Sequence, residues 1–110
     1  RVPVSDAALQ YAVTLVRQSR PGEGAPQHVR DWVGYGASVR AAQYLTLGAK
    51  ARALLDGRTH VAFEDVRALA HPVLRHRVLL NFHAQSERIT PDMVIERLLD
   101  AVKPPASGMR

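Results

Sequence analysis

The sequence predicts a small, mainly α-helical fold of four helices with a minor two-stranded β element. The chain has 110 residues, which is the size of one domain. Hydrophobic residues make up 46% of the chain but aromatic residues only 5%. The core must therefore consist mostly of Leu, Val and Ala, which suits packed helices better than a β-sandwich. Four segments also carry apolar residues at helical spacing next to capping residues.

The first helix is expected to begin after Ser5, which is a good N-cap residue. An acidic residue follows it in the first turn, where the helix dipole favours negative charge. The apolar stripe of this helix comprises Leu9, Ala12, Val13 and Val16. The helix should end near Gln18, because residues 19–27 are rich in Pro and Gly and are expected to form a loop.

The second helix is preceded by residues 31–36, which predict an extended approach to a turn. The helix should start at Ser38 as N-cap and run to about Leu55, with Gly57 as a left-handed C-cap. Small residues within its stripe would let a neighbouring helix come close. The predicted buried stripe comprises Ala41, Tyr44, Leu45, Gly48, Ala51 and Leu55.

The third helix is expected from about Glu64, with Pro72 limiting or kinking it. Its predicted apolar side comprises Val66, Leu69, Ala70 and Val73. Residues 77–82 are rich in β-formers and are expected to pair with residues 59–62 as a small ribbon. The last helix has Thr90 as N-cap and Pro91 at its first position. The stripe of this last helix comprises Ile95, Leu98, Leu99 and Val102.

Residues 1–102 are expected to form the domain, and residues 103–110, which contain two prolines and a glycine, a disordered tail. The chain has no cysteine, so disulfides and thiolate metal sites are excluded. It also shows no signal peptide and no apolar run of about 20 residues that could span a membrane. A cytoplasmic location is expected. Because the first residue is Arg and not Met, the chain is expected to be a piece of a longer protein.

Several kinds of chemistry lack the motifs they need. The sequence contains no phosphate-binding loop of the GxxxxGK[ST] type, no GxSxG nucleophile elbow and no HExxH zinc motif. No two of its histidines lie four positions apart on one predicted helix, so no metal site is expected. The histidines are His28, His60, His71, His76 and His83. The chain is therefore not expected to be an enzyme or to bind a cofactor by itself.

The most informative segment is residues 34–41, Gly-Tyr-Gly-Ala-Ser-Val-Arg-Ala. Arg40 lies in the first turn of the helix that Ser38 is expected to cap. A cation is unfavourable at a helix N-terminus unless an anion joins it, and a guanidinium suits phosphate. This arrangement predicts half of an anion site. The alternative is that Arg40 folds back onto a carboxylate such as Asp31, or points into water.

A second candidate is the basic connector formed by Arg75, His76 and Arg77. It is expected to contact phosphate, a neighbouring subunit or nucleic acid, or else to cover apolar surface with its arginine stems. The net charge of +5, from 15 Lys and Arg against 10 Asp and Glu, is scattered along the chain. A winged-helix-like nucleic-acid-binding module remains the alternative function. The second helix supports it poorly, because its basic residues are few among many alanines.

Four short motifs resemble, in the right order, those of the lid domain of MoxR-type AAA+ ATPases. Residues 36–41, Gly-Ala-Ser-Val-Arg-Ala, are similar to the Gly-Ala-Ser-Pro-Arg-Ala motif that opens this lid. The long Ala- and Leu-rich helix is followed by Asp-Gly-Arg at residues 56–58. Residues 61–66 resemble Val-Thr-Pro-Glu-Asp-Val, and residues 73–77 match Val-Leu-Arg-His-Arg. The resemblance extends from about residue 4 to residue 102, with Val39 and Ala62-Phe63 departing from the usual Pro and Thr-Pro.

The resemblance implies that residues 1–102 are the C-terminal helical lid of a larger ATPase. In this family, a homo-hexameric ring of upstream P-loop cores binds ATP and Mg²⁺, and the lid closes over the nucleotide. Arg40 would be the sensor 2 arginine that approaches the γ-phosphate, supported by Gly36, Ala37 and Ser38. The family is associated with chaperone-like maturation or metal insertion of client proteins, often beside proteins with von Willebrand factor A domains. Nucleic acid and membranes are not expected partners.

Overall fold

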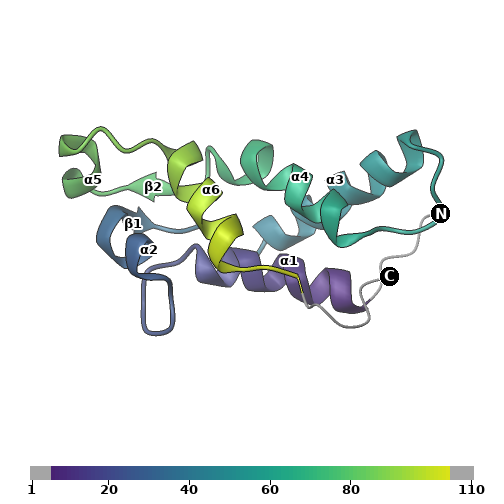
Figure 1. Ribbon diagram of the computed structural model, residues 1–110, viewed down its shortest axis with the longest axis horizontal. Helices are drawn as coiled ribbons and strands as arrows, with labels where there is room; N and C mark the ends of the chain where they lie inside the picture. Colours follow the sequence, from purple (N-terminus) through teal and green to yellow (C-terminus); the bar gives the residue numbers. More distant parts are fainter. Residues whose placement is uncertain (1–5, 105–110) are drawn as a thin grey trace.

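A computed structural model describes residues 6–104 as six helices and one two-stranded antiparallel sheet (Figure 1). The prediction of a mainly α fold with a minor two-stranded β element is confirmed. The predicted helices correspond to α1, α3, α4 and α6, whereas the short α2 and α5 were not predicted. In chain order the elements are α1 (Asp6–Gln18), α2 (Gln27–Trp32), β1 (Val33–Tyr35), α3 (Ala41–Leu55), α4 (Phe63–Leu74), β2 (Leu79–Leu80), α5 (Phe82–Ser86) and α6 (Pro91–Ala101).

The core lies where α3 and α4 pack on α1, and α6 crosses α4 and α1 (Figure 1). The sheet, α2 and α5 form the opposite end of the domain from the C-terminal end of α3 (Figure 1). Tyr11 of α1 helps to join these helices, because its hydroxyl donates to the carbonyl of Val102 over 2.7 Å. Arg67 of α4 donates to the Tyr11 hydroxyl over 2.7 Å and to the carbonyl of Leu99 over 3.1 Å. One side chain from α4 therefore caps the C-terminal end of α6.

The buried face of α3 differs from the predicted stripe. Tyr44 is 42% exposed, Leu55 is 89% exposed and Ala51 is also exposed, so placing these three residues in the core was wrong. Helix α3 has neighbours on two sides, α1 and α4, and only small side chains fit between closely spaced helices. The residues of α3 that are buried are Ala41, Ala42, Leu45, Ala49 and Ala53.

The predicted close approach at Gly48 is confirmed. A Cβ atom added to Gly48 would lie 2.6 Å from Cδ1 of Leu69 on α4. A similar correction applies to α1, where Leu9 is 43% exposed. The buried residues of α1 are Ala8, Tyr11, Ala12, Leu15 and Val16. The buried face of α1 therefore includes an additional alanine and a tyrosine that the predicted stripe left out.

The predicted ribbon has the wrong partner. Strand β2 pairs with β1, with Val33 opposite Leu80, and not with residues 59–62. The ends of the neighbouring helices explain this pairing. The Asn81 amide N–H donates to the carbonyl of Trp32 over 2.9 Å, and the Asn81 side chain donates to the carbonyl of Asp31 over 2.8 Å. Asn81 also caps α5, and these contacts between distant parts of the sequence fix the strand pair.

The predicted ends of the other helices agree well with the structure. The Thr90 hydroxyl accepts from the amide N–H of Met93 over 3.2 Å, and Pro91 is the first residue of α6. Gly57 has a φ of +74°, as a left-handed C-cap requires. Helix α4 continues through Pro72 to Leu74. No helix within residues 6–104 is long and apolar enough to cross a membrane. Most of the tail predicted at residues 103–110 lies outside the described residues.

Candidate functional site

The candidate site is the turn that leads into α3. The carbonyls of Ser38, Val39 and Arg40 accept from the amides three residues further on, over 2.9 to 3.1 Å. This is the bonding of a 3₁₀ turn, and the regular helix begins only at Ala41. The prediction that α3 starts directly after Ser38 was therefore early. Arg40 occupies the N-cap position, and no side chain caps this helix end.

Arg40 itself lies on the surface of the domain. Within residues 6–104 its guanidinium forms no ion pair and no side-chain hydrogen bond. The carboxylate of Asp31, the alternative partner considered from the sequence, instead accepts from the Gln27 side chain over 2.9 Å. Arg40 is thus an exposed cation at the start of a 15-residue helix. A role in binding phosphate stays a prediction.

The supporting residues Gly36, Ala37 and Ser38 lie close to the end of α1. A Cβ atom added to Gly36 would lie 2.4 Å from the carbonyl oxygen of Ser19. Ala37 is fully buried, and its amide N–H donates to the Ser19 hydroxyl over 3.3 Å. Ser38 is exposed. The segment before Arg40 is therefore attached to the chain just after α1, and Ser19 is a contributor that the sequence gave no reason to single out.

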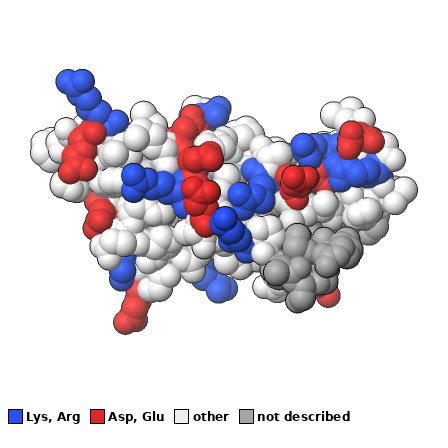
Figure 2. Space-filling model, viewed as in Figure 1, with Lys and Arg blue, Asp and Glu red and all other residues white. Residues whose placement is uncertain are grey.

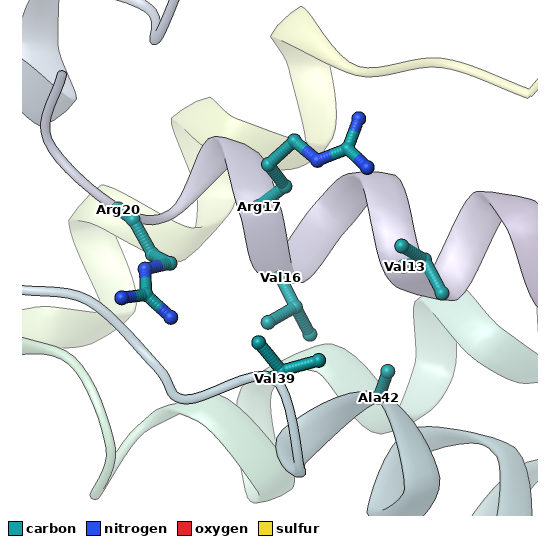
Figure 3. A pocket seen from close by; sticks show the side chains of 6 residues that line it. All are labelled: Val13, Val16, Arg17, Arg20, Val39 and Ala42. Carbon is teal, nitrogen blue, oxygen red and sulfur yellow. The ribbon is translucent and has the colours of Figure 1, made fainter.

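An apolar groove lies between α1 and α3, and Val39, the residue before Arg40, lines it (Figure 3). One part of it, about 350 Å³, is lined by Val13, Val16, Arg17, Arg20, Val39 and Ala42. In Figure 3 the valines and Ala42 face one another, and Arg20 lies at one end. A second part, about 360 Å³, shares Val13, Val39 and Ala42 and continues past Leu47 to Lys50. We call this surface the α1–α3 groove. Val39 is 69% exposed and Leu47 is 65% exposed, so apolar side chains face solvent along it.

The basic connector after α4 makes contacts within the domain. Nε of Arg75 donates to the carboxylate of Asp92 over 3.0 Å. Arg77 donates to the carbonyl of Val73 over 2.7 Å, and its guanidinium lies 4.6 Å from the ring centre of Tyr44. An arginine over an aromatic face is a favourable cation–π arrangement. These contacts hold both arginines against α6 and α3, and their role at an interface or near phosphate stays a prediction.

A histidine joins this network between α4 and α6. Nδ1 of His71 lies 2.8 Å from a carboxylate oxygen of Asp92, and its Nε2 lies 3.0 Å from one of Glu96. The hydrogen bond from His71, together with that from Arg75, holds the pKa of Asp92 below its usual value. His71 touches these carboxylates through different nitrogens, so the three groups do not converge on one point. Within residues 6–104, no group of three His, Asp or Glu side chains is placed to hold a metal ion.

A buried carboxylate joins two of the sequence motifs, and sequence reasoning missed it. Asp65 has no exposed side-chain surface, and its oxygens accept from Arg52 over 2.6 Å and from Arg58 over 2.6 Å. The amide N–H of Ala62 also donates to Asp65, over 2.8 Å. These hydrogen bonds, that from Arg58 above all, hold the pKa of Asp65 well below its usual range. The Asp-Gly-Arg and Glu-Asp-Val motifs therefore meet in one ion cluster at the α3–α4 turn.

A family model described as "AAA lid domain" matches residues 26–98, which include α2 to α5, most of α6 and the Arg40 turn. The chain belongs to the AAA lid domain family. The lid domain is 37% identical over 103 residues to the chaperone MoxR1 of Mycobacterium tuberculosis. It is 36% identical over 83 residues to the protein MoxR of Methylorubrum extorquens.

A solved structure gives the same result for the fold. The lid domain matches the crystal structure of a Cytophaga hutchinsonii protein that is assigned as an ATPase. The TM-score is 0.88 and the sequence identity is 35%. This match covers 94% of the lid domain and 32% of that chain. The match to MoxR1 covers 93% of the lid domain and 27% of that protein. The lid domain therefore spans about a third or less of these relatives, which also contain other regions.

Proposed function

We propose that this lid domain closes over ATP bound to the core of a MoxR-type AAA+ ATPase, and that Arg40 is its sensor 2 arginine. The observation that carries the proposal is the exposed guanidinium of Arg40 at the start of α3, within Gly-Ala-Ser-Val-Arg-Ala. Phosphoryl transfer depends on positioning and on stabilising charge at the transferred phosphate. An arginine on a closing lid supplies that charge only when nucleotide is present.

Electrostatics at the helix end support this role. The N-terminus of α3 carries partial positive charge, so a cation at the N-cap position is unfavourable in the isolated domain. Within residues 6–104 no carboxylate compensates Arg40. An approaching phosphate would interact favourably with the helix end and with the planar guanidinium, which binds two oxygens at once. The unfavourable placement in the free lid thus becomes favourable in the closed complex.

The α1–α3 groove suggests which face of the lid turns toward the core that binds the nucleotide. Exposed apolar side chains that form a continuous surface commonly mark a face that another molecule or domain covers. Leu9, Val39 and Leu47 are all exposed along this groove, and Val39 is the residue before Arg40. We propose that this face turns toward the nucleotide and the upstream core.

The remaining features of the parent protein follow from its family. We propose a P-loop core that binds ATP and Mg²⁺, assembly into a hexameric ring, and maturation or metal insertion of client proteins, in some cases with a von Willebrand factor A partner. The relative MoxR1 is described as a chaperone. On the face shown in Figure 2, Lys and Arg alternate with Asp and Glu, so this face presents no continuous basic surface for nucleic acid.

The test is ATP turnover by the full-length protein that carries this lid. Arg40→Ala should lower kcat by about 100- to 1000-fold, since removing one charge-stabilising donor has effects of this size. Arg40→Lys should fall between Arg40→Ala and the unchanged protein, because it keeps the charge but loses the planar fork. Arg30→Ala is the matched control, since Arg30 is exposed and, within residues 6–104, its side chain hydrogen-bonds only to Gln27 one turn away on α2. Unchanged turnover in Arg40→Ala would refute the proposal.

A further inference from the structure

Ser19 is a fully buried polar residue just after α1. Its hydroxyl donates to the carbonyl of Val16 over 2.6 Å and accepts from the amide N–H of Ala37 over 3.3 Å. The hydroxyl therefore connects the last turn of α1 to the segment that leads into α3. Ser19 and Ala37 are 18 residues apart in the chain. The contact joins two elements rather than closing a local turn.

Gly36 makes the second contact of the same junction. A Cβ atom there would lie 2.4 Å from the Ser19 carbonyl oxygen and 2.5 Å from Cα of Arg20. Both are backbone atoms, so they cannot move aside as the end of a flexible side chain can. The chain at Gly36 thus passes against the chain at Ser19 and Arg20 with no room for a side chain. Gly34 differs, because a Cβ atom there would make only ordinary contacts of 3.6 Å or more.

This junction lies a few residues before the proposed phosphate-binding arginine. Between Ala37 and Arg40 the backbone bonds of the 3₁₀ turn leave little freedom. The position of Arg40 relative to α1 therefore depends on where residues 36 and 37 are held, together with the packing of α3 on α1. Arg20, whose backbone touches Gly36, also lines the α1–α3 groove with Val39.

We infer that Ser19 and Gly36 are positioning residues for Arg40. They hold the turn before α3 against the end of α1, so that the guanidinium meets the phosphate when the lid closes. This inference rests on the proposed sensor 2 function. A displacement of about 1 Å in a group that must meet a reacting phosphate can lower the rate by about 100-fold. The junction therefore acts on the rate through Arg40 and not by touching nucleotide.

The experiment compares Ser19→Ala and Gly36→Ala in the full-length ATPase. Each should lower kcat by about 10- to 100-fold, while the KM for ATP changes much less. Thr14→Ala and Gly34→Ala are matched controls. Thr14 lies within α1, and its hydroxyl also donates to a carbonyl one turn back, that of Gln10. Gly34 is a glycine with room for a methyl group. Both controls should retain the original kcat.

A second background separates positioning from loss of structure. In the Arg40→Ala protein, Ser19→Ala and Gly36→Ala should cause no further fall in kcat, because no guanidinium remains to be positioned. Equal losses in both backgrounds would overturn the inference and indicate general destabilisation. If Gly36→Ala does not fold, Ser19→Ala alone decides, since it removes atoms and adds none.

The two proposals fail in different ways. Loss of turnover in Arg40→Ala but not in folded Ser19→Ala or Gly36→Ala would overturn this inference alone. Full turnover in Arg40→Ala would overturn the sensor 2 role and the positioning inference with it.

Discussion

At the residue scale, the best-defined interaction is the burial of Asp65 between two arginines. A carboxylate removed from water is costly unless charged partners and hydrogen bonds compensate it. Asp65 has both, since Arg52, Arg58 and the Ala62 amide all donate to it. The Ala62 contact also stabilises the first turn of α4, where this chain lacks the Thr-Pro usual in MoxR lids. The acidic residue of the motif thus has a structural role.

Replacing Asp65 should therefore destabilise the lid domain strongly. In Asp65→Asn an amide group would face the guanidiniums, and the charge of the carboxylate would be lost. Because both arginines are partly exposed, with 47% and 29% of their side chains accessible, we expect a loss below that of a fully buried pair. The expected loss is about 2–3 kcal/mol in the free energy of unfolding, measured by urea denaturation. Glu64→Gln, an exposed neighbour, is the control and should change stability little.

The same carboxylate gives a pH dependence of known sign. A carboxyl group whose pKa is lowered by folding stabilises the protein above its unfolded pKa of about 4. This stabilisation is lost as the pH falls from about 4 toward the folded pKa. Asp65 and Asp92 both have lowered pKa values. The stability difference between the unchanged protein and Asp65→Asn should be constant between pH 5 and 7 and shrink below about pH 4. A difference that grows on acidification would contradict the assigned ion cluster.

At the element scale, the packing of α3 on α4 depends on small residues. Gly48 lets the Leu69 side chain approach α3 at a distance that no Cβ atom permits. Sequence periodicity located α3 apart from its first turn, but it wrongly placed Tyr44, Ala51 and Leu55 in the buried stripe. Helices with close neighbours on two sides bury alanine and glycine and leave larger residues outside. Periodicity alone does not reveal how many neighbours a helix has.

Enlarging Gly48 should separate the two helices. Gly48→Val should lower the free energy of unfolding by about 1–3 kcal/mol, as overpacking a tight contact does. Ala51→Val is the matched control on the exposed side of the same helix. It should cost only the small helix-propensity difference, well under about 1 kcal/mol. Thermal unfolding of the two variants measures the difference, and equal losses would argue against a close α3–α4 contact at Gly48.

The elements that sequence reasoning missed share a physical cause. Helices α2 and α5 have six and five residues, too short for an apolar stripe to show. Tertiary contacts stabilise them, above all those that Asn81 makes with the end of α2. Tertiary contacts also decide the strand pair, which sequence reasoning wrongly formed from residues 77–82 and residues 59–62. Composition shows which residues favour strands but not which strands meet. The helices with clear local capping, such as α6 after Thr90, were predicted closely.

At the scale of the whole molecule, the domain is elongated, with extents of 44 × 26 × 19 Å. The Arg40 turn and the α1–α3 groove lie on the same part of its surface, and the four motifs of the family resemblance lie at the starts and ends of α3 and α4. Sequence reasoning could select Arg40 as the candidate phosphate-binding residue because the motif around it is local. It could not predict the contribution of Ser19, since the contact with Ala37 exists only once α1 and α3 are folded together.

The decisive observation is the position of Arg40 in the full-length protein bound to a non-hydrolysable ATP analogue. A structure of that complex should place a guanidinium nitrogen of Arg40 about 2.7–3.2 Å from a phosphate oxygen. The α1–α3 groove should then face the core. An Arg40 that points into solvent in the closed complex, while another lid residue or none contacts the phosphates, would contradict the proposed function.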